Sequence, residues 1–352
     1  MAHRTRVLAV IVGLALLAAA CGGDDDATEA DDARPSDDTT VTLLTHDSFA
    51  LSDETLAAFT DETGISVEVL QAGDTGTMVA EAILTAGSPL ADVMYGIDNT
   101  FLQRGLDAGL FVPHESPALD TVPEQLRLDP DHRVTPIDYG DVCVNYWTEA
   151  LPGEPPTTLD DLTDPANAGQ LVVQNPETSS PGLAFLLATI AAEGDGWEQY
   201  WADLRANDVS VTAGWEDAYY GEFAAGDGPR SMVVSYASSP PAEVIFADPP
   251  VQESPTGVVL DGCFRQIELA GVLAGTEHET EAGQLIDFML SPTFQEDLPL
   301  QMFVFPAVEG TPLPPEFEAH AAVPTDPLVI DPAEIEANRD EWTQRWTEIV
   351  LG

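Results

Sequence analysis

The sequence predicts an α/β protein with two lobes, and three observations support this. The chain has 352 residues, which is enough for two lobes that each bury a core. Its hydrophobic content of 44% is that of a globular protein. Between residues 41 and 236, β-rich runs alternate with helical patterns in two successive stretches. Such alternation is typical of mostly parallel sheets that are covered by helices.

The first stretch contains three strand–helix pairs. Ser52 or Asp53 can cap the first helix and Gly64 ends it, while Gly87 and Pro89 follow the second. The expected strands cover 41–45, 66–70 and 91–97, and the helices that follow them cover 53–63, 75–85 and 99–108.

The second stretch repeats this order after a long β-rich run. Ser180-Pro181 predicts a helix start, with the serine as N-cap and the proline at the first helical position. The expected strands cover 134–147, 170–174, 209–212 and 232–236, and the helices cover 182–192, 197–205 and 216–225.

The C-terminal part adds further elements to these two stretches. A strand is expected over 263–272 and a helix over 281–290. The proline-rich segment 311–318 is typical of a connecting loop. The last helix, over 332–350, places Trp342 and Trp346 on one face.

The charge of the chain is strongly one-sided. It has 62 acidic residues, 11 basic residues that are all arginine, and a net charge of -51. Such a surface repels nucleic acid and attracts cations, so no nucleic-acid partner is expected. A generally acidic proteome would explain most of these carboxylates. The absence of lysine excludes Schiff-base chemistry and a P-loop of the usual type.

The N-terminal residues are typical of an export signal. Arg4 and Arg6 precede an apolar run over 7–20, which is too short to span a bilayer. Leu17-Ala18-Ala19-Ala20-Cys21 resembles a bacterial lipobox, which implies that Cys21 is lipidated after cleavage. The alternative is an ordinary signal peptide with an incidental cysteine.

An acidic segment without large apolar residues follows Cys21 and is expected to be an extended tether. We therefore expect a protein held by a lipid on the outer face of the cell membrane. The expected organisation is a signal peptide with its lipidated cysteine at 1–21, the tether at 22–40, a first part of lobe 1 at 41–138, lobe 2 at 139–262, a return to lobe 1 at 263–310, and a C-terminal connecting loop and helix at 311–352.

Polar and aromatic side chains gather just after the expected strands. Ligands of open α/β sheets bind outside the carboxyl ends of strands, so these positions are candidate binding residues. They include the segments Thr45-His46-Asp47-Ser48-Phe49, Gly73-Asp74, Gly96-Ile97-Asp98-Asn99, Thr178-Ser179-Ser180, Gly214-Trp215-Glu216 and Ser235-Tyr236-Ala237-Ser238-Ser239.

Several collinear segments resemble the periplasmic thiamine-binding proteins of ABC importers. The resemblance runs from about Val41 to the C-terminus and implies the type II periplasmic-binding-protein fold, in which strands cross between two lobes at a hinge. The segments are THDSFA from Thr45, ADVMYGIDN from Ala91, PIDYG from Pro136, NPETSSPGL from Asn175, TAGWEDAY from Thr212, VVSYASSP from Val233 and FMLSPTFQ from Phe288.

The resemblance implies a binding protein without a cofactor, which captures thiamine or a thiamine phosphate and delivers it to an ABC permease. Aromatic faces attract the thiazolium cation by ~0.5–2 kcal/mol each, and a carboxylate supplies the counter-charge. Trp215 and Tyr236 match family aromatics, Asp47 and Asp98 are acidic candidates, and Ser179 and Ser180 could hold the tail of the ligand. The full expected set is His46, Asp47, Ser48, Asp74, Asp98, Asn99, Tyr139, Ser179, Ser180, Trp215, Tyr219, Tyr236, Ser238 and Phe303.

The chain departs from the family pattern at three positions. His46 and Ala242 stand where tyrosines are common, and Phe303 or Phe305 stands where a tryptophan is common. A smaller aromatic cage predicts weaker binding or a different form of the vitamin. Cys143 and Cys263 fall on the two strands assigned to the hinge, and we expect a disulfide between them.

Three alternative functions remain open. Apart from these, we expect a monomer that is not an enzyme. A ferric-ion binder would carry two adjacent tyrosines in the segment that here reads Ser235-Tyr236-Ala237. A thiaminase-like enzyme would need a reactive cysteine, for which Cys143 with Glu216 is the nearest imitation. A purely structural surface lipoprotein would show no closure on a ligand.

Overall fold

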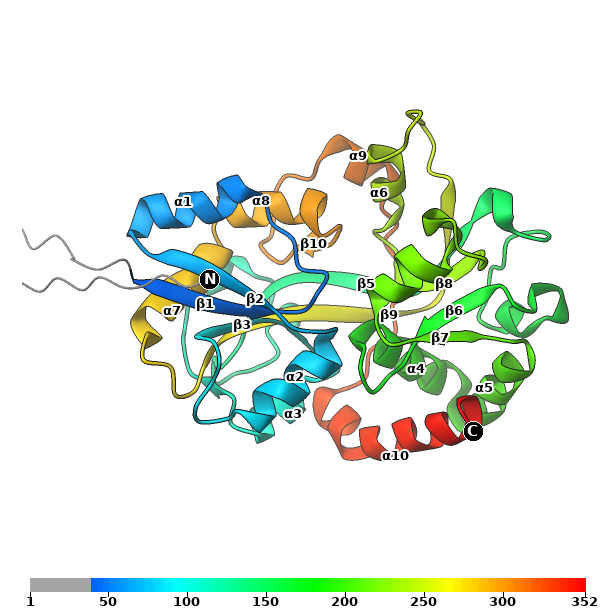
Figure 1. Cartoon of the computed structure of the whole chain (residues 1–352), viewed down its shortest axis with the longest axis horizontal. Coiled ribbons are helices and arrows are strands. Elements are labelled where there is room, and N and C mark those ends of the chain that lie inside the picture. Colours follow the sequence, from blue (N-terminus) through cyan, green and yellow to red (C-terminus); the bar gives the residue numbers. More distant parts are fainter. Residues whose placement is uncertain (1–38) are drawn as a thin grey trace, which may run out of the picture. The chain divides into compact units, whose positions relative to one another are not determined.

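The computed structural model describes residues 39–352, which form an α/β protein around one mixed sheet (Figure 1). The strands are β1 (Thr40–Thr45), β2 (Ser66–Gln71), β3 (Val93–Asp98), β4 (Phe111–Val112), β5 (Thr135–Trp147), β6 (Leu171–Gln174), β7 (Ser210–Thr212), β8 (Met232–Tyr236), β9 (Thr256–Leu273) and β10 (Phe305–Pro306). The α-helices are α1 (Asp53–Thr63), α2 (Thr75–Leu84), α3 (Leu102–Asp107), α4 (Ser180–Glu193), α5 (Trp197–Ala206), α6 (Pro240–Ile245), α7 (Glu279–Met289), α8 (Pro292–Gln301), α9 (Pro315–His320) and α10 (Pro332–Val350).

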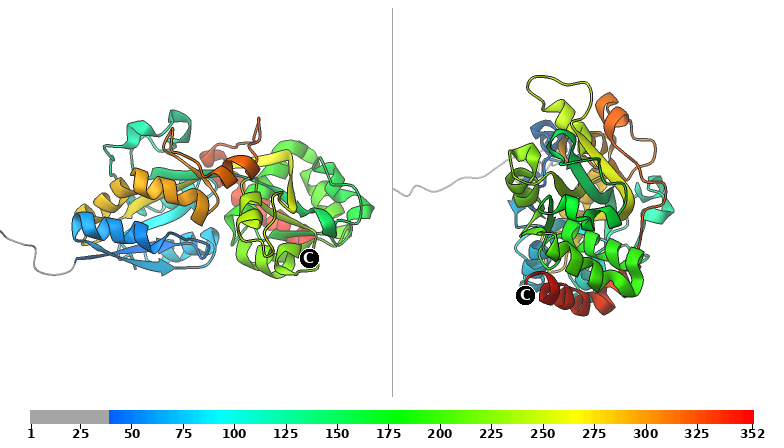
Figure 2. Two further views of the ribbon diagram at one scale, coloured as in Figure 1. Left: turned by 90° about the horizontal axis from the view of Figure 1, so that it is seen from above. Right: turned by 90° about the vertical axis from the view of Figure 1, so that its right-hand side faces the viewer.

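The sheet has the strand order β2-β1-β3-β9-β5-β8-β6-β7. At one end β1 pairs in parallel with β2 and β3, and at the other end β6 pairs in parallel with β7 and β8. The long strands β5 and β9 lie between these groups, antiparallel to each other and to their outer neighbours. We call the part around β1–β3 lobe 1 and the part around β6–β8 lobe 2. Figure 1 shows these long strands running from one lobe to the other, and Figure 2 shows the lobes from two further directions.

A disulfide joins β5 to β9 where their register shifts. The irregularity lies between Val142 and Val144 on β5, and Cys143 is bonded there to Cys263, with a Cα–Cα distance of 4.5 Å. Both cysteines are buried beside Ala237. The covalent link therefore lies in the region that both lobes share.

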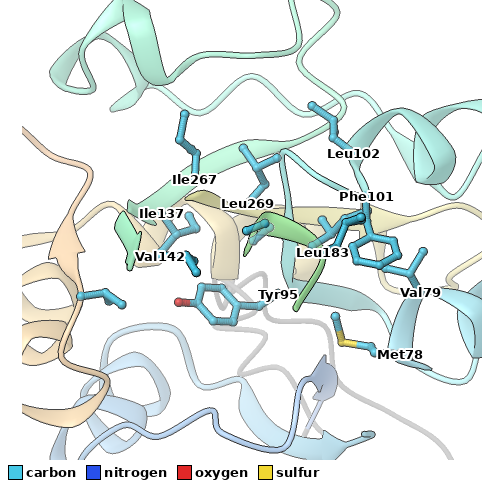
Figure 3. Packing of buried hydrophobic residues seen from close by; sticks show 14 of the residues in the cluster. Met78, Val79, Tyr95, Phe101, Leu102, Ile137, Val142, Leu183, Ile267 and Leu269 are labelled. Atoms are coloured by element: carbon cyan, nitrogen blue, oxygen red, sulfur yellow. The ribbon is translucent and has the colours of Figure 1, made fainter. Parts of the chain in front are cut away.

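The main core covers the sheet faces and continues through both lobes. Figure 3 shows part of it, with Met78 and Val79 of α2, Tyr95 of β3 and Leu183 of α4 among its members. On β3 every residue is buried, as expected for a strand with helices on both faces. This packing fixes the ends of the strands, and the functional site is built on those ends.

The C-terminal helix α10 contacts both lobes. Trp346 packs edge-on against Trp201 of α5 in lobe 2, with ring centroids 5.5 Å apart, and Arg345 forms an ion pair of 2.7 Å with Glu198. On the lobe 1 side, the guanidinium of Arg339 lies 5.6 Å from the ring centre of Phe101. Asp331 caps the start of the helix.

Several elements differ from the sequence predictions, and α6, α8, β4 and β10 were not predicted. The N-cap of α4 is Ser179, not Ser180, and its hydroxyl accepts from the Gly182 N–H. The expected helix over 216–225 is a π-helical segment, η7 (Asp217–Glu222), followed by a 3₁₀ turn. The loop over 311–318 contains the start of α9. The strand expected over 263–272 begins at Thr256 instead, and Gly262, with φ of 71°, lies inside it.

Other predicted features are not addressed by the described residues. Within residues 39–352 no helix is both long enough and apolar enough to span a bilayer. The signal peptide, Cys21 and nearly all of the tether over 22–40 lie outside this range. The lobe boundaries at 138 and 262 fall inside or beside β5 and β9, which belong to both lobes.

Candidate ligand-binding site

A cavity of about 910 Å³ lies where the two lobes meet. Lobe 1 contributes the segment after β1, the start of α2 and the segment after α8. Lobe 2 contributes the start of α4, the segment of η7, the end of β8 and the residues around α6. Apart from the segment after α8, these segments follow the carboxyl ends of parallel strands, as expected for a ligand site of an open α/β sheet.

Aromatic side chains from lobe 2 form one wall of the cavity. Trp215 and Tyr219 stack with ring centroids 4.8 Å apart, and Tyr220 lies edge-on to both of them. The indole N–H of Trp215 donates to the Ser235 hydroxyl at 3.0 Å. The π-helical geometry of η7 places Tyr219 and Tyr220 beside Trp215, so three rings come from six consecutive residues.

Tyr236 extends this aromatic wall from the end of β8. A glycine at position 140 on the neighbouring strand β5 permits its position, because a Cβ there would approach Cδ1 of Tyr236 to 2.9 Å. We call Trp215, Tyr219, Tyr220 and Tyr236 the aromatic wall. All four rings line the cavity.

Most of the titratable side chains that line the cavity are carboxylates. Burial raises the pKa of Glu216 and of Glu243 above the usual range, and Tyr219 donates to Glu243 at 2.8 Å. His46 is the single basic residue among the lining residues. The cavity carboxylates are Asp47, Asp74, Glu149, Glu216, Glu243, Asp248 and Glu268.

His46 faces Glu268 across the lobe 1 side of the cavity. Its Nε2 lies 3.6 Å from Oε1 of Glu268, and both side chains are buried. Burial disfavours the imidazolium, but Glu268, Asp74 and Asp47 outweigh burial and raise the pKa of His46. Gly96 on β3 has φ of 98°, and a side chain there would collide with the imidazole. The Oε2 atom of Glu268 has no hydrogen-bond partner among the described residues and is buried.

Asp74 connects the two lobes directly. It caps α2 in lobe 1, and its carboxylate accepts from the backbone N–H of Ser180 at 3.2 Å and of Trp215 at 3.0 Å in lobe 2. Burial raises the pKa of Asp74, and hydrogen bonds from Ser179 and Trp215 oppose this rise. A second contact runs from the Thr77 N–H to the Thr178 carbonyl at 3.3 Å. The cavity is therefore closed on this side by polar contacts between the lobes.

Most of the predicted binding residues meet at this cavity. They are His46, Asp47, Ser48, Asp74, Ser180, Trp215, Tyr219, Tyr236 and Phe303. Of the two phenylalanines considered, Phe303 lines the cavity, with φ of 55°, whereas Phe305 stacks on Tyr139 with ring centroids 5.4 Å apart. Ala242 also lines the cavity.

The other predicted residues do not line the cavity. Asp98 is buried, and its carboxylate accepts from the Thr100 N–H and hydroxyl and from Gln266. Asn99 bonds the backbone of Arg265 and Ile267 on β9. Tyr139 lies under the guanidinium of Arg265, Ser179 caps α4, and Ser238 is fully buried. Each of these residues lies within the fold and not at the cavity. The expectation that they contact the ligand therefore stays a prediction.

The prediction from the sequence missed several lining residues. Glu268 could have been found, because a carboxylate inside the apolar run of β9 needs a reason to be buried. Tyr220 and Glu243 give no such signal on their own. Trp147, at the end of β5, and Phe246, after α6, also line the cavity, and Phe246 contacts Phe303 edge-on at 5.9 Å.

Comparison with known proteins adds independent findings. The bacterial extracellular solute-binding protein family matches residues 88–338. The thiamine-binding periplasmic protein of Brucella suis is 30% identical over 87% of this chain and 91% of its own length. That of Escherichia coli is 29% identical over 88% of this chain and 93% of its own length.

Solved structures agree with the fold. A periplasmic thiamin binding protein superposes with a TM-score of 0.79 at 27% identity, covering 89% of this chain and 96% of the other. Iron-bound HitA from Pseudomonas aeruginosa, at 23% identity, has a TM-score of 0.70, covers 88% of this chain and 99% of the other, and supports the fold alone. The two lobes, the shared long strands and the sequence match together place this chain in the bacterial extracellular solute-binding protein family, with the type II periplasmic-binding-protein fold.

Proposed function

We propose that this protein captures thiamine between its two lobes and delivers it to an ABC transporter permease. The single observation that carries the proposal is the pairing of the aromatic wall with carboxylates in one cavity between the lobes. A permanently charged heteroaromatic ring needs both partners at once. The relatives named as thiamine-binding cover most of this chain, which supports the same ligand.

The aromatic wall suits the thiazolium and the aminopyrimidine rings. Trp215 and Tyr219 stack on each other, so their faces are held by packing before a ligand arrives. Each face attracts an organic cation by ~0.5–2 kcal/mol, with the larger values in a site that excludes water. A cavity of about 910 Å³ lies within the size range of small-molecule sites.

The carboxylates supply the counter-charge. The Oε2 atom of Glu268 is buried without a partner among residues 39–352, and Glu268 lines the cavity. An unpartnered buried carboxylate oxygen is costly unless a cation or donor approaches it. A bound thiazolium or amino group would offset that cost.

Capture requires that the ligand favour the closed arrangement. Asp74 bonds two lobe 2 segments, and one of them begins with Trp215, so closure and the aromatic wall are coupled through one carboxylate. A ligand that contacts both walls stabilises this arrangement over an open one. The closed monomer would then dock on the permease, while a lipid on Cys21 would keep the protein at the outer face of the cell membrane.

The proposal includes no reaction on the ligand. Cys143, the candidate nucleophile of an enzyme, is bonded to Cys263 and buried. A sulfur in a disulfide cannot act as the thiolate that such chemistry needs. Incubation of thiamine with the protein and an added nucleophile should leave the thiazole intact.

Calorimetry tests the proposal. The purified protein is titrated with thiamine and with ferric citrate, and small-angle scattering is recorded with and without thiamine. We expect saturable binding of thiamine with a 1:1 ratio and a smaller radius of gyration in the complex. Binding of iron without binding of thiamine would refute the proposal.

A further inference from the structure

Exposed apolar side chains lie at the rim of the cavity, and both lobes contribute them. Phe246 and Val251 from lobe 2 and Leu300 from lobe 1 are exposed and line the cavity. Phe246 is the most exposed of the three, at 71%. A single apolar residue on a surface needs no explanation, but a group of them around a cavity indicates a surface that covers a ligand. The rim is therefore a candidate ligand surface in addition to the aromatic wall.

One contact at this rim joins the two lobes. Phe246 follows α6 in lobe 2 and Phe303 follows α8 in lobe 1, and both line the cavity. Their rings meet edge-on, with centroids 5.9 Å apart and planes at 72°, which is a favoured geometry for two aromatic rings. We call Phe246 and Phe303 the aromatic pair. Because its members belong to different lobes, their contact exists only when the lobes meet.

The last turn of α6 places the ring of Phe246 at the cavity. The Phe246 N–H donates to the Ala242 carbonyl at 2.9 Å, so Ala242 lies one helical turn earlier. Residues four apart lie on the same face of a helix, and both of these line the cavity. Ala242 adds only a methyl group to that face, so the ring of Phe246 supplies most of its apolar surface.

The backbone at Phe303 is held in an uncommon conformation. Its φ is 55°, in the left-handed region that bulky residues rarely adopt. Such a conformation persists only where the surrounding structure holds it. The neighbouring residues do so, because Met302 accepts from the Tyr95 hydroxyl at 3.6 Å and Val304 is buried. The ring of Phe303 is therefore fixed at the rim before it meets Phe246.

The aromatic pair is a second contact between the lobes, in addition to the bonds of Asp74. Asp74 joins the starts of α2 and α4, which lie below the long strands β5 and β9 in the view of Figure 1, whereas α6 and α8 lie above them. The cavity is lined from both places. A ligand inside it would therefore lie between a polar contact on one side and the aromatic pair on the other.

We propose that the aromatic pair retains the bound ligand and sets the rate of its release. This inference rests on the proposed function and names residues that control the same site. The lobes must separate before the ligand leaves, so the contact between the two rings must be lost first. The ligand enters before that contact forms. The aromatic pair therefore slows dissociation more than it slows association.

Stopped-flow fluorescence with thiamine tests the proposal, because it gives the association and dissociation rate constants separately. Phe246→Ala should raise the dissociation rate constant about three- to tenfold and change the association rate constant by about twofold or less. Phe246→Tyr keeps a ring and should stay close to the wild type. Ile245→Ala is the matched control, since Ile245 is the exposed neighbour that does not line the cavity, and it should leave both rate constants unchanged.

A double variant tests whether the two rings act through each other. Phe246→Ala combined with Phe303→Ala should release thiamine about as fast as the faster single variant, because either change alone removes the contact. Phe303→Leu serves the same comparison if alanine at this position prevents folding. Effects that multiply in the double variant would overturn the inference, as would equal effects of Phe246→Ala and Ile245→Ala.

The same measurements separate this inference from the proposed function. If the wild-type protein binds thiamine and Phe246→Ala releases it at the wild-type rate, the inference is wrong and the proposed function stands. If the wild-type protein does not bind thiamine, both are wrong.

Discussion

The two walls of the cavity differ in what holds their side chains in place. The aromatic wall of lobe 2 is held by ring packing and by the bond from Trp215 to Ser235, all within one lobe. On the lobe 1 side, Asp74 accepts from the Thr75 N–H of its own helix and from two backbone N–H groups of lobe 2. Ring packing within a lobe does not depend on closure, whereas the contacts of Asp74 with Ser180 and Trp215 exist only when the lobes meet. We therefore expect the aromatic wall to carry initial capture and the acidic side to carry closure.

Breaking the link between β5 and β9 should affect stability more than either wall. Replacement of Cys143 and Cys263 by serine should lower the free energy of unfolding by ~2–4 kcal/mol, because the bond closes a separation of 120 residues. Urea unfolding measures this, with a Cys21→Ser background as the matched control. Thiol titration of that denatured, unreduced control should find no reactive thiol, and two thiols would contradict the disulfide.

Removing one ring tests the capture role of the aromatic wall. Trp215→Ala should weaken thiamine binding by ~1–3 kcal/mol, since stacking and cation–π attraction are both lost. Trp215→Phe keeps a ring and should lose less. Calorimetry gives both values, and an unchanged dissociation constant in Trp215→Ala would remove this wall from the site.

Altering Asp74 tests the closure role of the acidic side. In Asp74→Asn the amide N–H₂ faces N–H donors of lobe 2, so the closed arrangement should lose about 1.5 kcal/mol, close to a tenfold weaker affinity. Small-angle scattering should show a smaller ligand-induced decrease in the radius of gyration. If Asp74→Asn binds thiamine more weakly but still closes fully, the assignment of closure to the acidic side is wrong.

The smallest expected effect concerns His46 and pH. Its pKa is raised, so a falling pH forms an imidazolium that competes with the bound cation for Glu268. A bound cation lowers this pKa in turn, so binding releases a proton and affinity should fall a few-fold between pH 8 and pH 6. His46→Gln should flatten the dependence, and a titration series by calorimetry at each pH measures it. If the affinity for thiamine instead rises toward low pH, the expected competition between the imidazolium and the bound cation is wrong.

The elements with strong local signals could be predicted from the sequence. Ser52 and Gly64 bound α1, and Pro332 to Val350 form α10, because capping and apolar spacing act over a few residues. The π-helical form of η7 and the helix α8 were missed. Pro299 inside α8 argues against a helix locally, and only packing of Phe294 and Leu298 into the core outweighs it.

The predicted site residues also differ in how far the sequence alone indicates their position. Residues that follow parallel strands, such as His46, Asp74, Trp215 and Tyr236, could be predicted because strand ends of one sheet meet at one edge. Asp98 and Asn99 also follow a strand, yet the described fold uses their side chains to bond β9 and its neighbours. Whether a polar side chain faces the cavity or the sheet depends on the strand beside it, which is distant in the sequence.

The sequence by itself determined the α/β class, the acidic charge and the aromatic and carboxylate side chains at the strand ends, because these depend on composition and on short-range periodicity. Only the tertiary structure decided that Glu268 is buried at the cavity, that Asp74 reaches into lobe 2, and that no arginine of residues 39–352 lines the site. These outcomes depend on contacts between residues that are far apart along the chain. Which side chains a ligand would meet is therefore a property of that three-dimensional grouping.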